Sequence, residues 1–276
     1  MLQLIAEIQQ RIKQSGAETV AVVASDCSSE HNILINPDIS FHTASVFKIC
    51  VMMEVFHQAR QGYFSLDDAL LIKNEFYSIV DQSTFSLSIT DDSETDLYRS
   101  IGNSLKIMDL VTRMITHSSN LATNILIELV NPSKVNDFMH QLDAKELIVI
   151  RGVEDKKAFK YGLNNLATAR SLMQILTKLA IKQVVSQDAS ETMIAILKQQ
   201  KHNTGIPAML PSDVSIAHKT GWINLIYHDA AIIFPSDQEP YVLVIMTRGI
   251  PDDAEAHTLV SSLSKLIYDR QHKWRS

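Results

Sequence analysis

Segments with strand character near both ends of the chain, on either side of a long stretch with helical spacing, limit what this sequence can fold into. Near the N-terminus, Glu18 to Ser25 is apolar and β-branched, and Ile33 to Ile35 follows a polar turn, which predicts a hairpin. Near the C-terminus, Tyr227 to Phe234 and Tyr241 to Thr247 predict a second hairpin, whose loop runs through Asp237. An antiparallel sheet built from both sets of strands, with a helical lobe inserted between them, is the simplest α+β arrangement.

Between the hairpins, apolar side chains recur at helical spacing. The expected helices are Val46–Gln61, Leu105–Thr116, Asn120–Leu129, Pro132–Leu142, Leu166–Ala180 and Ser190–Gln199. Amphipathic helices are also expected at the two ends, one through Leu2, Ile5, Ile8 and Ile12 and the other from Asp252 to His272. We therefore predict one domain over residues 1–276, with an α/β lobe of about residues 1–44 and 205–276, a helical lobe of about residues 45–204, and a cleft between the lobes.

Charge and composition argue against several kinds of partner. The net charge is -6, and the Lys and Arg residues are scattered along the chain, so we expect no nucleic acid partner. No apolar run approaches the roughly 20 residues that a membrane-spanning helix needs. The two cysteines, Cys27 and Cys50, cannot form a disulfide framework on which a fold of this size depends, so we expect two thiols. No His/Cys/Asp cluster has ligand spacing, and neither a metal nor another cofactor is expected.

The expected oligomeric state is a monomer. No export signal precedes the first expected helix, which favours a cytoplasmic protein. If a leader is missing from the sequence given, the alternative is a periplasmic or extracellular one.

A serine three residues before a lysine, at the start of an expected helix, is the first chemical signal: Ser45-Val46-Phe47-Lys48. Free backbone N–H groups at a helix start can stabilise an oxyanion when a serine oxygen attacks a carbonyl. Lys48 lies one turn later on the same face. It is either neutral through burial and neighbouring cations, or acts electrostatically while another base works, and both possibilities stay open. Ser262 and Lys265 repeat the spacing in the last expected helix, where a solvated face explains them.

The second motif is Ser118-Ser119-Asn120, at a corner between two expected helices. A hydroxyl there can pass a proton to a leaving nitrogen, and the Asn120 amide can hold both a substrate carbonyl and the lysine. The alternative is that Ser118 or Ser119 is an ordinary helix N-cap.

The third motif, Lys219-Thr220-Gly221, is expected to end an edge strand that runs from Val214 to His218. A cation beside a hydroxyl can bind a carboxylate, and a glycine lets the substrate backbone approach. The N–H of Trp222 would then be a second oxyanion donor. An ordinary strand-end turn is the alternative.

In this combination the motifs resemble those of the class A β-lactamases and their penicillin-binding relatives, which carry S-x-x-K, S-D-N and K-T-G. The likeness covers about Glu18 to Tyr268 and includes the corner from Met114 to Asn124 and the strand from Val242 to Gly249. It implies the β-lactamase/transpeptidase-like fold. It also implies the following roles: Ser45 as acylated nucleophile, Lys48 as its activator, Ser118 as proton shuttle, Asn120 as anchor of substrate and lysine, Lys219 and Thr220 as carboxylate site, and the amides of Ser45 and Trp222 as oxyanion hole.

The sequence departs from the family pattern at three places. Ser119 stands where an aspartate is common. The E-P-E-L-N loop is not found between Ile148 and Asn165, and Glu154 is the acid that we align with the deacylation base. The alternative for Glu154 is a loop carboxylate in an ion pair with Lys157 or Arg151.

The arginine that many relatives place near the third motif is not evident either. His228 occupies roughly that position and is a candidate substrate-binding residue. Its alternative is a core or edge histidine bonded to Asp229 or to the backbone.

The resemblance implies a serine hydrolase that opens β-lactam or related amide or ester substrates through an acyl-enzyme on Ser45. The expected partner is a small molecule, either a β-lactam or a peptidoglycan-like compound. Two alternatives share the same motifs. One is a DD-peptidase-like or esterase-like enzyme, and the other is a β-lactam-binding sensor that is acylated without turnover.

Overall fold

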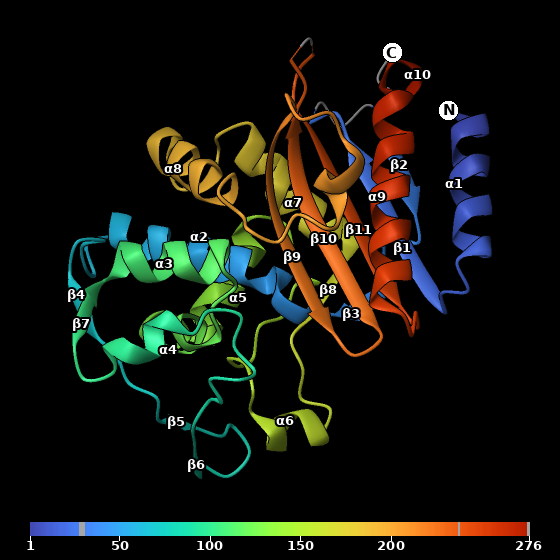
Figure 1. The fold of residues 1–276 in the computed structure, drawn as a ribbon. Helices are drawn as coiled ribbons and strands as arrows, with labels where there is room; N and C mark the ends of the chain where they lie inside the picture. Colours follow the sequence, from blue (N-terminus) through green and yellow to red (C-terminus); the bar gives the residue numbers. More distant parts are fainter. Residues whose placement is uncertain (28–30, 237, 275–276) are drawn as a thin grey trace.

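The computed structural model describes residues 1–27, 31–236 and 238–274. Its centre is a five-stranded antiparallel sheet with the strand order β2-β1-β11-β10-β9 (Figure 1). The strands are β1 (Thr19–Ser25), β2 (Asn32–Ile35), β9 (Ser215–Ile223), β10 (Ile226–Phe234) and β11 (Tyr241–Arg248). Both predicted hairpins are confirmed by their strand pairings, apart from residues 28–30 in the first loop and Asp237 in the second, which lie outside the described residues. Pairing of β1 with β11 joins strands from the two ends of the chain in one sheet, as predicted.

Both faces of the sheet are apolar, because successive residues of a strand point to opposite sides. In β1, Ala21 and Val23 belong to one hydrophobic cluster, and Val20 and Val22 belong to the other. The second cluster is closed by the two terminal helices, α1 (Leu2–Gln14) and α9 (Asp253–Asp269), which lie side by side in Figure 1. The short α10 (Gln271–Trp274) follows α9. Leu2 is an error of the prediction, since it is 85% exposed and Leu4 is buried instead.

Helices from the middle of the chain cover the first face of the sheet and extend away from it (Figure 1). All six expected helices are confirmed. They are α2 (Lys48–Arg60), α3 (Ile107–Thr116), α4 (Asn120–Val130), α5 (Pro132–Gln141), α7 (Ala169–Ala180) and α8 (Gln187–Leu197). Helix α7 packs directly on β1, β10 and β11. Helix α2 is buried continuously from Lys48 to Phe56, so it forms the centre of the helical packing.

Short elements connect the longer helices and strands. They are β3 (Ser40–His42), η1 (Ala44–Phe47), β4 (Ala69–Leu71), β5 (Phe76–Tyr77), β6 (Thr84–Phe85), η2 (Asp96–Ser100), β7 (Ser104–Lys106), α6 (Lys156–Lys160), β8 (Leu166–Thr168) and η3 (Ile206–Met209). β3 pairs with β8, β4 with β7, and β5 with β6. Because β8 takes the first three residues of the helix expected from Leu166, α7 begins later, capped by Thr168.

Strand β9 corrects one prediction that concerns the site. The strand was expected to stop at His218, but it continues to Ile223 because it pairs with β10 over its whole length. Lys219-Thr220-Gly221 therefore lies within the edge strand rather than in a turn at its end. Gly221 is opposite His228 in the register.

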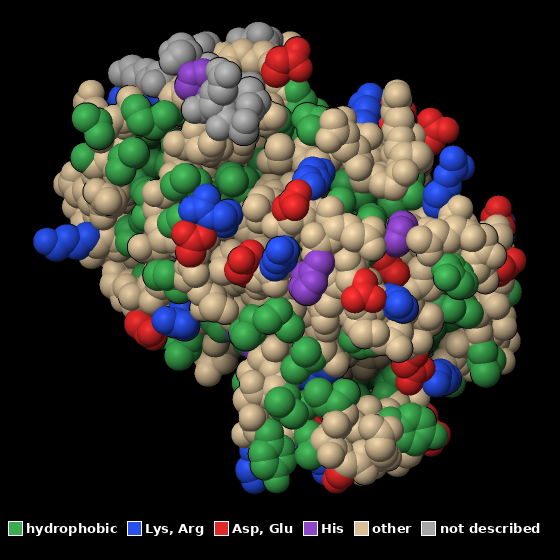
Figure 2. Space-filling view, turned by 180° about the vertical axis from the view of Figure 1, so that it is seen from behind, with side chains coloured by type: hydrophobic (Ala, Val, Ile, Leu, Met, Phe, Trp, Pro, Cys, Tyr) green, Lys and Arg blue, Asp and Glu red, His purple; other side chains and the backbone are tan. Residues whose placement is uncertain are grey.

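The surface shows no single-sign field on the face seen from behind, where cationic and anionic side chains are interspersed (Figure 2). Within residues 1–27, 31–236 and 238–274, no helix has the length and apolar character needed to cross a bilayer. The same residues contain no group of three or more His, Cys, Asp or Glu side chains arranged to hold a metal ion. Cys27 and Cys50 are both thiols, and Cys50 is buried.

Candidate active site

The edge strand β9 lies directly against the backbone of Ser45. Ser45 is in η1, at the entry to α2, and its side chain is half-buried. A Cβ atom added at Gly221 would lie 2.6 Å from the Ser45 nitrogen and 2.9 Å from the Val46 nitrogen. Only glycine fits at this contact. The sequence predicted that Gly221 would let a substrate approach, whereas in the structure it is the nucleophile's own backbone that approaches.

Lys48 links the start of α2 to the corner between α3 and α4. Its Nζ donates hydrogen bonds to the Ser118 carbonyl oxygen at 2.6 Å, to Ser118 Oγ at 3.2 Å and to Asn120 Oδ1 at 3.0 Å. The side chain is fully buried, and this burial lowers the pKa of Lys48 to about 7, against the opposing effect of the Asp92 and Glu154 carboxylates. A neutral amine is therefore accessible near neutral pH. This favours the possibility that Lys48 accepts a proton.

A second lysine reaches the same hydroxyl from the sheet. Lys219 Nζ donates to Ser118 Oγ at 3.1 Å and to the Thr220 carbonyl oxygen at 2.7 Å. Burial lowers the pKa of Lys219 well below its usual value, and the charge of Lys48 lowers it further, while Asp229 opposes the shift. Because both amines donate to Ser118 Oγ, the hydroxyl's own proton is available to a third group. Ser118 holds this position with a φ of 59°, in the left-handed region.

Thr220 carries a buried hydroxyl, Oγ1, with no hydrogen-bond partner among the residues that the structure describes. Buried polar groups are nearly always bonded, so an orphan hydroxyl beside a lysine suits a ligand that brings its own acceptor. Trp222 follows in the same strand, and its side chain is 39% exposed. Its ring meets the His202 ring edge-on, with centroids 4.9 Å apart.

Glu154 is connected to the lysine through Asn120. Asn120 Nδ2 donates to Glu154 Oε1 at 2.8 Å, and the Ser88 N–H donates to Glu154 Oε2 at 3.3 Å. Burial raises the pKa of Glu154, although these two hydrogen bonds lower it. The residue has a φ of 61° and is half-buried.

The ion pairs considered as the alternative for Glu154 do not form in the structure. Lys157 binds Asp81 at 2.8 Å instead. The guanidinium of Arg151 donates to the backbone oxygens of Gly152 and Leu163 and to Asn164. The Glu154 carboxylate is therefore bonded to Asn120, the residue that also accepts from Lys48.

Asn124 holds that loop in place. It accepts a hydrogen bond from the Val153 N–H at 2.7 Å and donates to the Val153 oxygen at 3.1 Å. The backbone of this loop passes so close to Asn124 that a Cβ atom added at Gly152 would lie 2.1 Å from Asn124 Oδ1 and overlap it.

His228 lies opposite Gly221 in the register, but both nitrogens of its ring are bonded to the protein's own backbone, and the substrate-binding role predicted for it is corrected here. Its side chain is fully buried. Nε2 contacts the His42 carbonyl oxygen at 2.9 Å, and Nδ1 accepts from the Thr247 N–H at 3.2 Å. Burial lowers the pKa of His228 to about 4, so the ring is neutral and bonded at both nitrogens. The alternative of a core histidine bonded to the backbone is confirmed.

Ser119 and Ser118 share the second motif but differ in what they do. Ser119 is the N-cap of α4, with its Oγ accepting from the Ala122 N–H at 3.3 Å, so the capping alternative is confirmed for this serine. The first two N–H groups of α4 are bonded by Asp92, which the sequence analysis missed. Asp92 lies 28 residues before Asn120, and no local spacing reveals a contact at that range.

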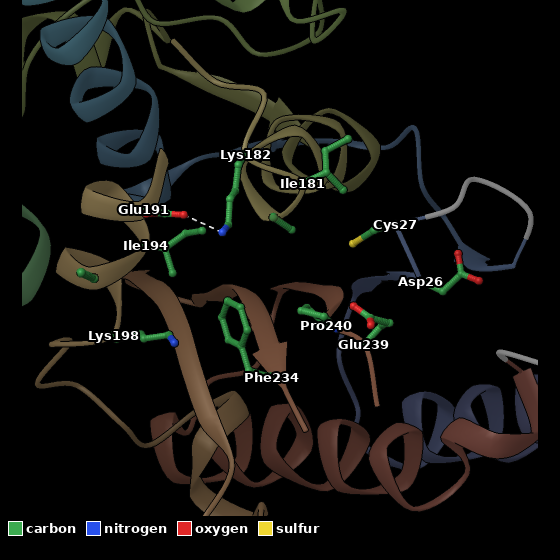
Figure 3. Close-up of a pocket in the computed structure, with 12 residues that line it drawn as sticks. Asp26, Cys27, Ile181, Lys182, Glu191, Ile194, Lys198, Phe234, Glu239 and Pro240 are labelled. Atoms are coloured by element: carbon green, nitrogen blue, oxygen red, sulfur yellow. Dashed lines mark hydrogen bonds and ion pairs between the residues drawn. The ribbon is translucent and has the colours of Figure 1, made fainter. Parts of the chain in front are cut away.

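A cavity of about 690 Å³ lies elsewhere, between α7, α8 and the sheet (Figure 3). Its described lining contains none of the candidate site residues. Lys182 and Glu191 form an ion pair of 2.6 Å at its wall, with Ile194 and Phe234 nearby. The volume of this cavity therefore does not indicate where the candidate residues around Ser45 lie.

Comparison with known proteins relates the whole chain to one group. A model of the beta-lactamase enzyme family matches residues 3–271. The extended-spectrum beta-lactamase PER-1 from Pseudomonas aeruginosa is 24% identical, over 92% of this chain and 83% of that protein. The carbapenem-hydrolyzing beta-lactamase KPC from Klebsiella oxytoca is 22% identical, over 96% and 88%.

Solved structures show the same fold. A beta-lactamase from Chitinophaga pinensis superposes with a TM-score of 0.84 at 19% identity, covering 98% of this chain and 99% of that one. PBP-A superposes with a TM-score of 0.85 at 22% identity, covering 98% and 96%. A mutant of PBP-A, solved as an acyl-enzyme complex with penicillin G, has a TM-score of 0.83 at 20% identity, over 99% and 97%.

Proposed function

The chain belongs to the beta-lactamase enzyme family, and from this premise we propose that it is a serine hydrolase that opens β-lactam rings through an acyl-enzyme on Ser45. One observation carries the proposal. Two buried lysines from different parts of the fold, Lys48 and Lys219, donate to the same hydroxyl, Ser118 Oγ, at 3.2 and 3.1 Å. Such a cluster costs solvation free energy and adds like-charge repulsion, which indicates selection for chemistry rather than for stability.

The acylation step uses the groups around Ser45. The neutral amine of Lys48 takes the proton of Ser45 Oγ as that oxygen attacks the β-lactam carbonyl carbon. The N–H groups of Ser45 and Trp222 stabilise the oxyanion. When the amide C–N bond breaks, Ser118 gives its proton to the leaving nitrogen and regains one from Lys48, to which it is already hydrogen-bonded.

The substrate carboxylate binds beside this relay. Lys219 supplies a buried amine and Thr220 a buried hydroxyl that is without a partner among the described residues. A carboxylate can accept from both groups at once, and a hydrogen bond that involves a charged group is roughly twice as strong as a neutral one.

Hydrolysis of the acyl-enzyme needs a base for water, and Glu154 is our candidate. Its carboxylate is fixed by Asn120 at 2.8 Å, on the side of the loop that faces Lys48. A positioned base contributes typically ~10²–10⁴-fold in rate. Loss of Glu154 would therefore slow deacylation far more than acylation.

The test is intact mass spectrometry after mixing the protein with penicillin G, together with turnover of a chromogenic cephalosporin. The wild type is expected to turn over without a lasting adduct, Ser45→Ala to form no adduct, and Glu154→Gln to accumulate one penicilloyl group. Asp81→Asn is the matched control, because Asp81 is an exposed carboxylate bound to Lys157. It is expected to behave as wild type.

The outcomes separate the alternatives. A wild-type adduct that persists would contradict hydrolysis and favour a sensor. Absence of both adduct and colour would refute the β-lactam proposal and leave an esterase-like enzyme. Equal behaviour of Glu154→Gln and wild type would refute the role given to Glu154 alone.

A further inference from the structure

We propose that Asp92 is a positioning residue of this site: its carboxylate anchors the start of α4 and thereby holds Asn120 between Lys48 and Glu154. The kinetic consequence rests on the proposed function, whereas the anchoring is a property of the fold and can be measured without turnover.

The Asp92 carboxylate is almost fully buried, at 7% exposure, and is saturated with donors. Oδ1 accepts from the N–H groups of Asn120 and Glu94, each at 3.0 Å. Oδ2 accepts from the N–H of Asn120 at 3.0 Å, from the N–H of Leu121 at 2.9 Å and from the hydroxyl of Tyr98 at 3.1 Å. Tyr98 lies in η2, so the carboxylate ties the loop before η2 to the start of α4.

The start of a helix needs such partners, because its first N–H groups have no acceptor within the helix. In α4, Ser119 Oγ accepts from the Ala122 N–H, whereas the N–H groups of Asn120 and Leu121 are bonded by Asp92. A negative charge at this end also interacts favourably with the helix dipole, which the neutral hydroxyl of Ser119 does not provide. Asp92 therefore supplies the charge of the cap from a distant loop.

Asn120 connects the anchored start of α4 to the side chains that we propose to act in catalysis. Its Oδ1 accepts from Lys48 Nζ at 3.0 Å, and its Nδ2 donates to Glu154 Oε1 at 2.8 Å. The backbone of the same residue is bound to Asp92 at both carboxylate oxygens. A shift of the α4 start would therefore move the groups proposed to activate Ser45 and water relative to each other.

Asp92 also contributes charge at this point. The carboxylates that act on Lys48 are Asp92 in the loop before η2 and Glu154 in the loop before α6, and Lys219 on β9 and His202 before η3 interact with it as well. Asp91 also acts on Glu154, and Asp229 acts on Lys219. The negative charge of Asp92 raises the pKa of Lys48 and also that of Glu154. Its removal should lower both pKa values.

The test uses Asp92→Asn, with Asp91→Asn as the matched control. Asp91 is the exposed neighbour, and the contact it makes with Asn120 runs through its backbone oxygen, which the substitution keeps. In ¹H–¹⁵N spectra, the amide protons of Asn120 and Leu121 should move upfield in Asp92→Asn and stay in place in Asp91→Asn. The pKa of Lys48, followed by NMR of labelled lysine side chains, should fall more in Asp92→Asn than in the control.

Kinetics supply the second readout. The acylation rate with penicillin G at pH 7 should fall by about 10- to 100-fold in Asp92→Asn, because a displacement of about 1 Å is sufficient for a loss of that size. The control should stay within about twofold of wild type. A merely structural role would lower the melting temperature but would leave the Lys48 titration and the acylation rate of the folded protein unchanged.

Tyr98→Phe is a second test, for the case in which Asp92→Asn does not fold. It removes one donor from Asp92 Oδ2 but leaves the N–H bonds, so more negative charge remains for Asn120 and Leu121, and their amide protons should move downfield, opposite to Asp92→Asn. Unchanged amide signals in both variants, or equal Lys48 titrations in Asp92→Asn and Asp91→Asn, would overturn the inference. A wild-type protein that penicillin G does not acylate would refute the proposed function, while the NMR result still decides the role of Asp92.

Discussion

Gly221→Ala tests whether β9 and the nucleophile must be in contact. An added Cβ would lie 2.6 Å from the Ser45 nitrogen, so one backbone must yield by about 0.8 Å to reach the 3.4 Å of ordinary contact. Neither side can adapt by rotating a side chain, because the nearest atoms are backbone nitrogens of Ser45 and Val46. Overpacking of this kind costs about 1–3 kcal/mol of stability. A displaced oxyanion donor should lower the acylation rate by up to about 100-fold.

The assay pairs urea unfolding with the acylation rate measured by a fluorescent penicillin. Ser215→Ala is the control, because Ser215 lies at the other end of β9 and is exposed. It should leave both measurements unchanged. If Gly221→Ala acylates at the wild-type rate with an unchanged free energy of unfolding, the close contact between β9 and Ser45 is not what places the oxyanion donors, and the reasoning fails.

Three further predictions concern titration and burial. The acylation rate should rise with pH around a midpoint near 7, because burial lowers the pKa of Lys48 to about 7 and only the neutral amine accepts a proton; a stopped-flow rate that is flat across that range would contradict this. The unfolded state binds more protons at Lys48 between about pH 7 and 10.5, so this group makes the free energy of unfolding increase with pH in that window, and Lys48→Met should remove the increase in urea titrations. His228→Ala should lower the free energy of unfolding by about 1–3 kcal/mol, since it leaves the buried N–H of Thr247 without an acceptor, but the acylation rate of the folded protein should not change.

The sequence predicted the sheet and the long helices because each has a local cause. The β-branched segments around Val22 and Ile245 and the helical spacing from Leu105 onward determine local structure without reference to distant residues. The pairing of the short connecting strands was not predicted, because pairs such as β3 with β8 join residues far apart in the chain, and three-residue strands carry no periodicity. The extension of β9 through Gly221 was missed for a related reason, since its partner strand and not its composition maintains it.

The candidate site also contains some residues that local sequence reveals and others that it does not. Ser45, Lys48, Ser118, Asn120 and Lys219 could be selected from motifs, and the structure brings them together. Asp92 could not, because its importance comes from a contact across 28 residues with a helix start. The position of His228 was predicted wrongly, since sequence register places it beside Gly221 but does not reveal that its ring points into the core, toward the backbone of His42.

The pairing of β1 with β11 has a consequence for how the protein is made. A ribosome releases Ser45 and the whole of α2 long before it releases Tyr241–Arg248, the strand that connects the first hairpin to the last. Until then the edge of β1 that β11 later covers is unpaired, and such edges favour aggregation. Biosynthesis should therefore depend on protection of the nascent N-terminal third. Removal of roughly the last 40 residues should abolish folding of the whole domain, because it removes the strand that joins the two hairpins.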